Sequence, residues 1–345
     1  MNRTSPPANK LRVLVLTDQG LVPDRPRSQL KGRERELKKT EYDVMAALKR
    51  MGHDATCVGL GGDLAVIDRA LRRARPHMTF NLIEALKELP YFDQHVVSYL
   101  ELRKQKYTGC NARGLIIARD KSLTKKVLAY HRIPVPRFAV VHKRKKILIP
   151  KRLRFPIFVK PLNVEGSEGI SNASLVRDVD RLVERVSFIH EKVDAPALVE
   201  EFIEGREIYV GAFGNEQLTV LPAWELTMTK LAEGSPLIAT DKAKWDPQHQ
   251  KKVGLRTGPA RLERPVASSL ELLSKRIYRL LGLSGYARLD YRLNKFGAFY
   301  LLEANPNPQI ARDEDFARSA THAGMSYAEL LQKLITLGQS YTPKA

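Results

Sequence analysis

Strand-like and helix-like patterns alternate along the first third of the chain. The apolar run at residues 11–16 (LRVLVL) predicts a buried strand, and a polar loop with two prolines follows it. The next helical pattern ends at Gly52 and carries four apolar residues on one face: Leu37, Val44, Met45 and Leu48. A second strand at 55–60 leads into another amphipathic helix, and a short apolar segment follows at 78–83. This alternation predicts a parallel sheet with flanking helices over roughly the first 115 residues.

Beyond residue 120 the pattern predicts a mixture of helices and strands. A short helix at 122–130 stops before two prolines, and helical patterns return at about 176–192 and 265–281. Between them lie the β-rich runs FPIFVKP, PALVEEFI, REIYVGAFG, LTVLPAWEL, GYARLDYRL and AFYLLEAN. The last helix opens with a capping box, SYAE, at 326–329. The predicted fold class is therefore α/β followed by α+β.

Composition narrows the class of protein. With 345 residues and 43% hydrophobic positions, the chain can bury a sizeable core. The formal charge of +20 indicates an anionic partner. Two cysteines, Cys57 and Cys110, are too few for a disulfide framework or a Cys-rich zinc site. No apolar run approaches the roughly 18 to 20 residues that span a bilayer, so we expect a cytoplasmic protein that does not cross a membrane.

Two features could bind phosphate groups, but the residues favour simpler interpretations. Seven Lys or Arg residues lie between Lys143 and Arg154, which would suit nucleic acid. Because aromatic residues are not interleaved with them, a solvated loop is the favoured interpretation. Gly59, Gly61 and Gly62 invite a dinucleotide site, but their spacing is not GxGxxG and favours a tight strand-to-helix turn.

The segment 287–310 carries the most informative chemistry, because its two alternating strands and short turn predict a hairpin. Arg288 and Asp290 share one face of the first strand. Glu303 and Asn305 share one face of the second. Two carboxylates and an amide oxygen brought together are hard donors of the kind that Mg²⁺ prefers beside a polyphosphate. The alternative is that both carboxylates point outward on a solvated sheet.

Two upstream segments could complete a nucleotide site. Lys160 ends a β-rich run, and a loop containing Gly166, Ser167 and Gly169 follows it. A lysine on a strand beside a glycine-bearing loop is typical of a phosphate clamp. Three acidic residues surround the next apolar strand and could bind adenine and ribose, or form a solvated strand edge: Glu200, Glu201 and Glu207.

Together these segments resemble the ATP-grasp superfamily, and within it the D-alanine–D-alanine ligase family. Four motifs carry the resemblance: Asp120-Lys121 with Thr124-Lys125; Phe155 to Pro161 with Glu165 to Ser167; Val199 to Glu207; and Arg288-x-Asp290 with Tyr300 to Asn305. It implies a three-part architecture, with an N-terminal α/β domain at 10–118, a central subdomain at 119–205 and a C-terminal catalytic subdomain at 206–340.

The resemblance also implies roles for individual residues. Lys121 and Lys160 would hold the ATP phosphates, and Asp290, Glu303 and Asn305 would bind two Mg²⁺ or Mn²⁺ ions. The remaining ATP contacts would come from Glu200, Glu201, Ile203, Glu207, Leu302 and the closing-loop lysine, Lys244. Ser167 would lie over the reacting groups, and Arg288 would stabilise the tetrahedral intermediate. The implied reaction activates a carboxylate as an acyl phosphate, forms an amide with an amine and releases ADP and phosphate.

The sequence departs from the family where the amino-acid substrates would bind. Gln309 replaces the usual glycine, and an acidic trio follows that would repel a carboxylate: Asp313, Glu314 and Asp315. The substrate-gripping glutamate has three unranked candidates, Glu34, Glu36 and Glu41, and the glycine loop has one extra residue, Val164. The substrates could therefore be D-alanine, another amino acid, or a peptide or protein terminus. A basic, nucleic-acid-associated ATP-binding protein without ligase activity is the alternative class. The resemblance also implies that the protein could form a homodimer.

Overall fold

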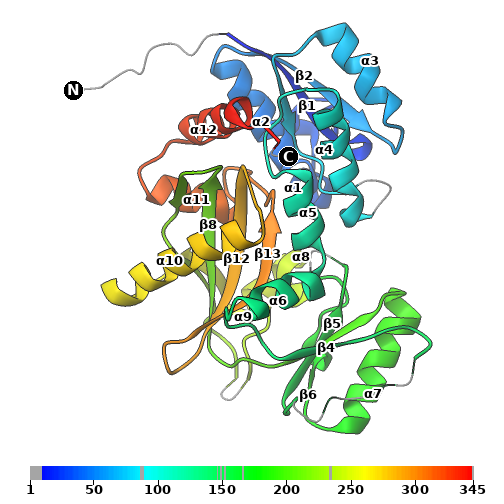
Figure 1. Ribbon diagram of the computed structural model, residues 1–345, viewed down its shortest axis with the longest axis vertical. Helices are drawn as coiled ribbons and strands as arrows, with labels where there is room; N and C mark the ends of the chain where they lie inside the picture. Colours follow the sequence, from blue (N-terminus) through cyan, green and yellow to red (C-terminus); the bar gives the residue numbers. More distant parts are fainter. Residues whose placement is uncertain are drawn as a thin grey trace.

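A computed structural model describes residues 10–85, 89–145, 147, 150, 153–164, 167–232 and 235–343. Over these residues the strands form three separate sheets, stacked along the long axis of the molecule in Figure 1. None of the helices in the described ranges is both long enough and apolar enough to cross a membrane.

The first sheet is parallel, as the alternating pattern predicts. Its order is β2 (Asp54–Leu60), β1 (Arg12–Asp18), β3 (Met78–Asn81). The helices of this region are α1 (Gly32–Leu37), α2 (Lys39–Arg50), α3 (Ala65–Ala74), α4 (Asp93–Leu102) and α5 (Ala112–Arg119). One detail of the prediction is wrong: Leu37 ends α1 and is 42% exposed. The helical conformation is interrupted at Lys38, between α1 and α2. Leu37 therefore does not belong to the buried face of α2.

The other two sheets are antiparallel. The second has the order β4 (Phe138–Val141), β7 (Ala197–Glu201), β5 (Ile157–Pro161), β6 (Leu175–Val176), and α7 (Val179–Phe188) packs against it. The third has the order β11 (Leu255–Pro259), β10 (Trp224–Met228), β8 (Arg206–Gly214), β12 (Tyr286–Leu293), β13 (Phe299–Pro306), with β9 (Leu218–Val220) paired to β8. The remaining helices are α6 (Lys121–Tyr130), α8 (Asp241–Trp245), α9 (Pro247–Val253), α10 (Arg264–Leu280), α11 (Asp315–His322) and α12 (Tyr327–Ser340).

The end of the chain returns to the first sheet. Helix α12 begins with the predicted capping box, in which Ser326 and Glu329 bond reciprocally. Its buried residues share one core with β1, β3 and α2, although the third sheet separates them in sequence. Figure 1 shows α12 beside the first sheet, and the C-terminus ends there. The proposed domain division at residues 118/119 and 205/206 remains a prediction, and this helix packs across it.

Close packing of α12 makes Gly338 a sensitive position. A Cβ at Gly338 would lie 2.1 Å from the backbone oxygen of Tyr107. We expect Gly338→Ala to lower the free energy of unfolding by about 1–3 kcal/mol, because the backbone itself must shift. Gly258→Ala is the matched control, since a Cβ there meets nothing within 4 Å. Urea unfolding of both variants tests this, and equal stability of the two would contradict it.

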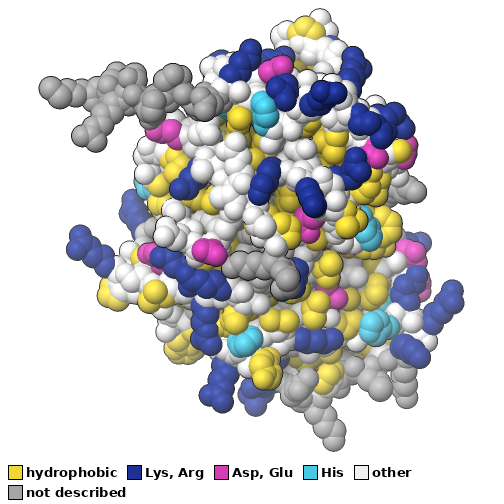
Figure 2. All heavy atoms as spheres, turned by 45° about the horizontal axis from the view of Figure 1, so that its top comes forward, with side chains coloured by type: hydrophobic (Ala, Val, Ile, Leu, Met, Phe, Trp, Pro, Cys, Tyr) yellow, Lys and Arg dark blue, Asp and Glu magenta, His cyan; other side chains and the backbone are white. Residues whose placement is uncertain are grey.

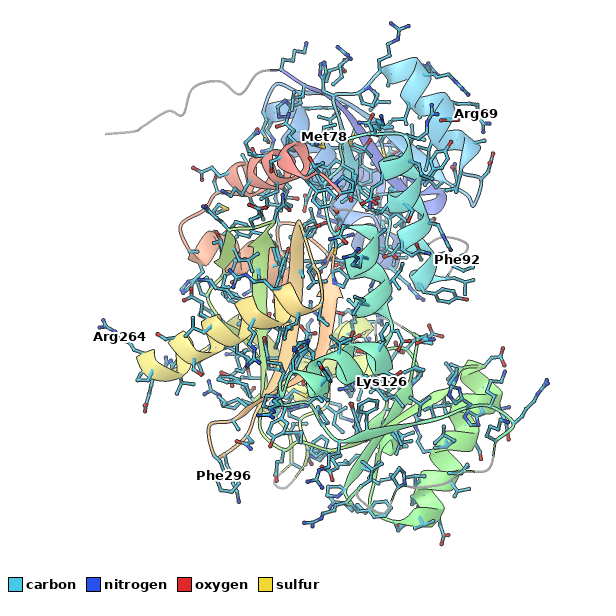
Figure 3. The ribbon with its side chains drawn as sticks, in the orientation of Figure 1. Arg69, Met78, Phe92, Lys126, Arg264 and Phe296 are labelled. Carbon is cyan, nitrogen blue, oxygen red and sulfur yellow. The ribbon has the colours of Figure 1, made fainter. Side chains whose placement is uncertain are left out.

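The basic residues are spread over the surface and do not form one stripe. Figure 2 shows Lys and Arg side chains scattered over the visible face, with acidic residues between several of them. In the predicted basic cluster, Lys143 pairs with Asp194, while residues 146, 148–149 and 151–152 lie outside the described chain. Figure 3 shows Arg264 at the outer end of helix α10 and Phe296 at the turn between β12 and β13, where Phe296 is 82% exposed.

Candidate active site

One large cavity gathers the residues singled out from the sequence. It has a volume of about 1210 Å³ and is lined from β5, β7, β8, β12 and β13, together with α1, α6 and α8. Its lining includes all thirteen residues to which the resemblance gives a role: Lys121, Lys160, Ser167, Glu200, Glu201, Ile203, Glu207, Lys244, Arg288, Asp290, Leu302, Glu303 and Asn305. Glu165 and Gly166 of the predicted glycine loop lie outside the described residues. Gly59, Gly61 and Gly62 are not in the lining, and the interpretation as a tight turn stands.

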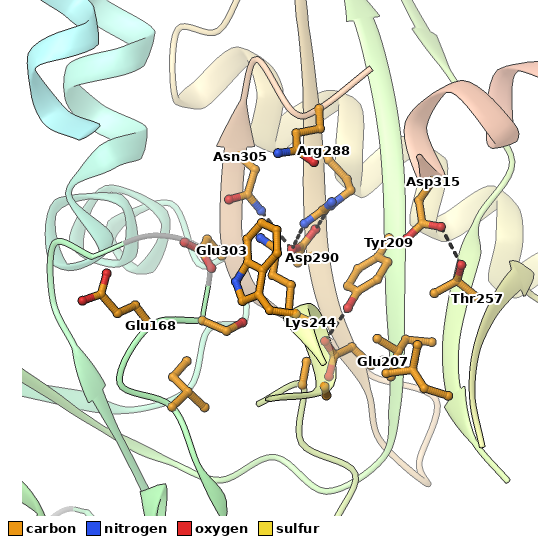
Figure 4. Close-up of a pocket in the computed structure, with 18 of the residues that line it drawn as sticks. Glu168, Glu207, Tyr209, Lys244, Thr257, Arg288, Asp290, Glu303, Asn305 and Asp315 are labelled. Atoms are coloured by element: carbon orange, nitrogen blue, oxygen red, sulfur yellow. Dashed lines mark hydrogen bonds and ion pairs between the residues drawn. The ribbon is translucent and has the colours of Figure 1, made fainter. Parts of the chain in front are cut away.

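The late hairpin places its polar side chains as predicted. Arg288 lies opposite Asn305 and Asp290 lies opposite Glu303 in the β12–β13 register, with an irregularity just after Asp290. Figure 4 shows these four side chains gathered at one place in the pocket. The guanidinium of Arg288 donates to both carboxylate oxygens of Asp290 at 2.8 and 2.9 Å, and the Asn305 amide donates to Asp290 at 2.9 Å. The outward-facing alternative is therefore wrong.

This set of donors fits a divalent cation with a polyphosphate. Two carboxylates and the amide oxygen of Asn305 lie across one strand pair. In the part of the chain that the structure describes, no three His, Cys, Asp or Glu side chains cluster as a metal site. The phosphates would thus have to supply the remaining oxygens, as is usual for Mg²⁺.

The two carboxylates differ in their proton affinity. Burial raises the pKa of Asp290 to about 6, against the opposing effect of Arg288. Partial burial also acts to raise the pKa of Glu303, but the cations Lys121 and Lys160 outweigh it and lower that pKa to about 2. Glu303 is therefore ionised throughout the physiological range.

Helix α6 carries two lysines four residues apart on one face: Lys121, which lines the cavity, and Lys125, which is buried outside the lining. Asp120 caps this helix by accepting from the backbone N–H groups of Ser122 and Leu123. Lys121 lies 3.0 Å from Glu303 and donates to the carbonyl of Val164 at 2.9 Å. Of the two ammonium groups that we expected to hold phosphate, that of Lys121 thus faces Glu303 of the hairpin.

Glu200, Lys125 and Lys160 form a buried ionic triad at the cavity. Glu200 accepts from Lys160 at 2.8 Å and pairs with Lys125 at 3.0 Å. Lys125 also donates to the carbonyl of Leu302 at 3.2 Å. All three side chains are at least nine-tenths buried. The sequence assigns Lys125 of the Thr124-Lys125 motif no role of its own, although its i+4 spacing from Lys121 places both lysines on one helix face.

The proposed adenine and ribose side contains a second ion pair that the sequence did not indicate. Glu207 pairs with the buried Arg292 at 2.8 Å and accepts from the hydroxyl of Tyr209 at 2.7 Å. Arg292 also donates to the carbonyls of Gly205 and Leu237. On β7 of the second sheet, Glu201 accepts from the backbone N–H of Arg154 at 3.2 Å. Glu207 and Glu201 therefore have partners in the protein, and only Glu207 is held by a buried charge.

The residues that the resemblance places over the site also line the cavity. Lys244 lies on α8, with its ammonium 5.2 Å from the ring centre of Trp245, and both residues line the pocket. Figure 4 labels Lys244 below Asp290 in the centre of the pocket. Ser167 has a left-handed backbone, with φ of 65°, and lines the same space. Their assigned roles remain predictions.

At the far end of the cavity, the acidic trio is paired with cations. Lys39 lies 2.6 Å from Glu314 and 3.4 Å from Asp313. Asp315 accepts from Thr257 at 2.6 Å and lies 3.6 Å from Arg318. Much of the negative charge expected to repel a carboxylate is therefore compensated by these cations. Gln309 lines this end, as its place in the sequence implied.

The three candidate substrate glutamates lie in different environments. Glu36 lines the cavity and pairs with Lys39 at 3.3 Å. Glu34 pairs with Arg25 at 2.6 Å. Glu41 is buried outside the lining and accepts from the hydroxyl of Thr17 at 2.8 Å, and its second carboxylate oxygen has no hydrogen-bond partner among the described residues. Of the three, only Glu36 is in a position to meet a ligand in this cavity.

The burial of Glu41 predicts a pH-dependent stability. Burial raises its pKa from an ordinary value of 4.5 to about 7, and nearby Glu84 and Asp18 add to the rise. Its contribution is fully present below pH 4.5 and is lost as the pH rises through 7. Between pH 5.5 and 8.5 we expect Glu41→Gln to gain about 2 kcal/mol of unfolding free energy relative to wild type. Urea unfolding at the two pH values measures this, and a constant difference would contradict it.

Comparisons with known proteins agree with this geometry. The family profile described as "D-ala D-ala ligase C-terminus" matches residues 127–336. An uncharacterized protein, y4sG, of Sinorhizobium fredii is 33% identical and covers 85% of each chain. The D-alanine–D-alanine ligase of Syntrophotalea carbinolica is 29% identical over 88% of this chain and 91% of its own. That of Streptococcus thermophilus is 28% identical over 73% of this chain and 70% of its own.

Solved structures show the same fold. The D-alanine–D-alanine ligase of Bacillus anthracis in complex with ATP superposes with a TM-score of 0.74 at 21% identity, covering 95% of this chain and 97% of that one. The VanG D-Ala:D-Ser ligase of Enterococcus faecalis superposes with a TM-score of 0.70 at 19% identity, covering 96% and 100%.

The fold and the cavity thus define an ATP-grasp protein, and the expected three-part architecture with a parallel N-terminal sheet is confirmed. The chain belongs to the D-alanine–D-alanine ligase family, a family of ATP-dependent ligases that form carbon–nitrogen bonds. The resemblance identified from the sequence is confirmed at this level.

Proposed function

We propose that this protein is a carboxylate–amine ligase that uses ATP and Mg²⁺ to join two small amino-acid or peptide substrates. The carboxylate would be converted to an acyl phosphate, which the amine attacks to form an amide with release of phosphate. ATP is required because a free carboxylate has no adequate leaving group. Bound Mg²⁺ or Mn²⁺ would supply charge neutralisation at the transferring phosphoryl group.

The residues of the cavity have defined tasks in this proposal. Asp290, Glu303 and the amide oxygen of Asn305 would hold the metal, and Lys121 and Lys160 would bind phosphate oxygens. On the adenine and ribose side, Glu207 is held in place by Arg292 at 2.8 Å. The bidentate contact with Asp290 fixes the direction of the guanidinium of Arg288.

Arg288 would also stabilise the oxyanion of the tetrahedral intermediate. Its side chain lines the cavity beside Asp290, and Gln309 lines the end that follows β13. The backbone N–H of Gln309 is the proposed second donor. A donor aimed at such an oxyanion contributes about 3–4 kcal/mol of transition-state stabilisation in comparable sites. No covalent intermediate on the enzyme is needed.

The observation that carries the proposal is the meeting of β12–β13 with α6 and β5. Lys121 contacts Glu303 at 3.0 Å, so a phosphate-binding cation and a metal-binding carboxylate face the same space. Both belong to segments far apart in the sequence. A protein that only bound nucleic acid through its surface charge would not need this arrangement.

Phosphate release from ATP across substrate pairs tests the proposal. Donors would be D-alanine, L-alanine, glycine and L-glutamate, and acceptors would be D-alanine, D-serine, L-lysine and putrescine, with the amide product followed by mass spectrometry. We expect phosphate release to depend on both a donor and an acceptor. Release that is independent of every amine, or that occurs without an amide product, would contradict ligation.

The substrate pair is proposed only as far as the cavity supports it. D-alanine with D-alanine is one candidate. Gln309 places a larger side chain than the family's glycine at the acceptor end, which supports another amino acid or a peptide terminus as acceptor. A cytoplasmic location belongs to this proposal and is supported by the two free cysteines. Homodimer formation stays a prediction, and nucleic-acid binding through the basic surface stays the alternative that is not favoured.

A further inference from the structure

Lys39, at the start of helix α2, forms ion pairs with acidic residues that line the cavity near Gln309. The ammonium of Lys39 lies 2.6 Å from Glu314, 3.4 Å from Asp313 and 3.3 Å from Glu36. The Lys39 ammonium therefore forms ion pairs with three carboxylates, and the Lys39 side chain is only 14% exposed. Burial acts against the charge of Lys39, but the carboxylates outweigh it and raise its pKa.

One turn further along α2, Asp43 holds the same segment by its backbone. Its carboxylate accepts from the backbone N–H of Arg312 at 3.0 Å and from the guanidinium of Arg27 at 2.5 Å. The guanidinium of Arg312 in turn lies 4.2 Å from the ring centre of Tyr327, at the start of α12. The two α2 residues thus fix residues 312–314 from one side.

The segment that these contacts hold, residues 307–314, is neither a helix nor a strand. It connects the end of β13 at Pro306 with the start of α11 at Asp315, and none of the strands in the described ranges pairs with it. Ile310 and Ala311 are buried, whereas Asp313 and Glu314 line the cavity. The position of this wall therefore depends on side-chain contacts from α2 more than on a sheet ladder.

We propose that Lys39 is a positioning residue that fixes the acceptor end of the cavity by holding Asp313 and Glu314. This inference rests on the proposed ligase function, because only a ligase has an acceptor amine to place. Lys39 does not need to touch the reacting atoms. Its removal leaves three carboxylates without their shared cation, and their mutual repulsion moves the wall beside Gln309.

Kinetics separate this role from a general structural one. The variants are Lys39→Ala and Lys39→Arg, and Lys275→Ala is the matched control because it removes an ion pair with Glu271 on α10. With the most active amine of the phosphate-release screen, we expect Lys39→Ala to raise the KM for that amine about tenfold and to change the KM for ATP by less than about twofold. Lys39→Arg should show only a small part of this rise in the KM for the amine, because arginine keeps the positive charge. An equal rise in both KM values, or no rise, would overturn the positioning role.

Hydrogen exchange provides a readout that needs no substrate. In Lys39→Ala, amide exchange over residues 308–318 should rise about tenfold, with no change over β12 and β13. The reason is that the variant loses the ion pairs of Lys39 and keeps the sheet. Unchanged exchange in an otherwise active variant overturns the positioning role alone. If wild type makes no amide from any pair, the proposed function falls and the positioning role falls with it.

Discussion

Glu303→Gln is expected to lower the rate of ATP-dependent phosphate release by roughly 100-fold or more, because it would remove the charge of a proposed metal ligand at the transferring phosphate. Glu303 is a sharp test because Lys121 and Lys160 hold its pKa at about 2, against the effect of burial. It is therefore ionised at every pH at which the enzyme would be assayed. The variant keeps the volume and one acceptor oxygen but loses the charge.

The loss should appear in kcat at saturating ATP and metal, with little change in folding. Glu271→Gln is the matched control, since its partner Lys275 lies one turn away on α10 and its side chain is 50% exposed. That variant should retain the wild-type rate within about twofold. If both variants turned over at the wild-type rate, Glu303 would have no part in catalysis.

The second large effect concerns stability. Glu200→Gln is expected to lower the free energy of unfolding by about 3–5 kcal/mol, because it leaves the buried ammonium groups of Lys125 and Lys160 without their shared counter-charge. Both lysines lie within 3.0 Å of this carboxylate. Burial already lowers the pKa of Lys125, although Glu200 opposes that shift, so the lysine is sensitive to loss of its partner.

A double variant makes this measurement specific. Glu200→Gln with Lys125→Met should be more stable than Glu200→Gln alone, because one uncompensated charge has been removed. Glu184→Gln on α7 is the exposed control, with a side chain 68% exposed, and should change the stability by less than about 0.5 kcal/mol. If Glu200→Gln were as stable as that control in urea unfolding, the triad would contribute nothing to the fold.

Local patterns were sufficient to predict much of the fold. The period of two along 287–310 predicted the hairpin, and the same period placed Arg288 with Asp290 on one face. The capping box at 326–329 predicted the start of α12. These features depend on neighbours in sequence, so a single chain is enough to reveal them.

Features that depend on distant partners could not be predicted in this way. Glu200 looked like a strand-edge charge, but Lys125 and Lys160 make it the centre of a buried triad. The acidic residues at 313 and 314 looked unpaired because Lys39, which holds them, lies more than 270 positions earlier in the sequence. Only the folded chain brings such charges together.

A structure with a non-hydrolysable ATP analogue and Mn²⁺ tests the central claim most directly, because anomalous scattering locates the metal. The account predicts Mn²⁺ about 2.0–2.3 Å from oxygens of Asp290, Glu303 and Asn305, with the phosphates beside Lys121 and Lys160. Metal or nucleotide bound elsewhere, with those carboxylates still paired only to Arg288 and Lys121, would contradict it.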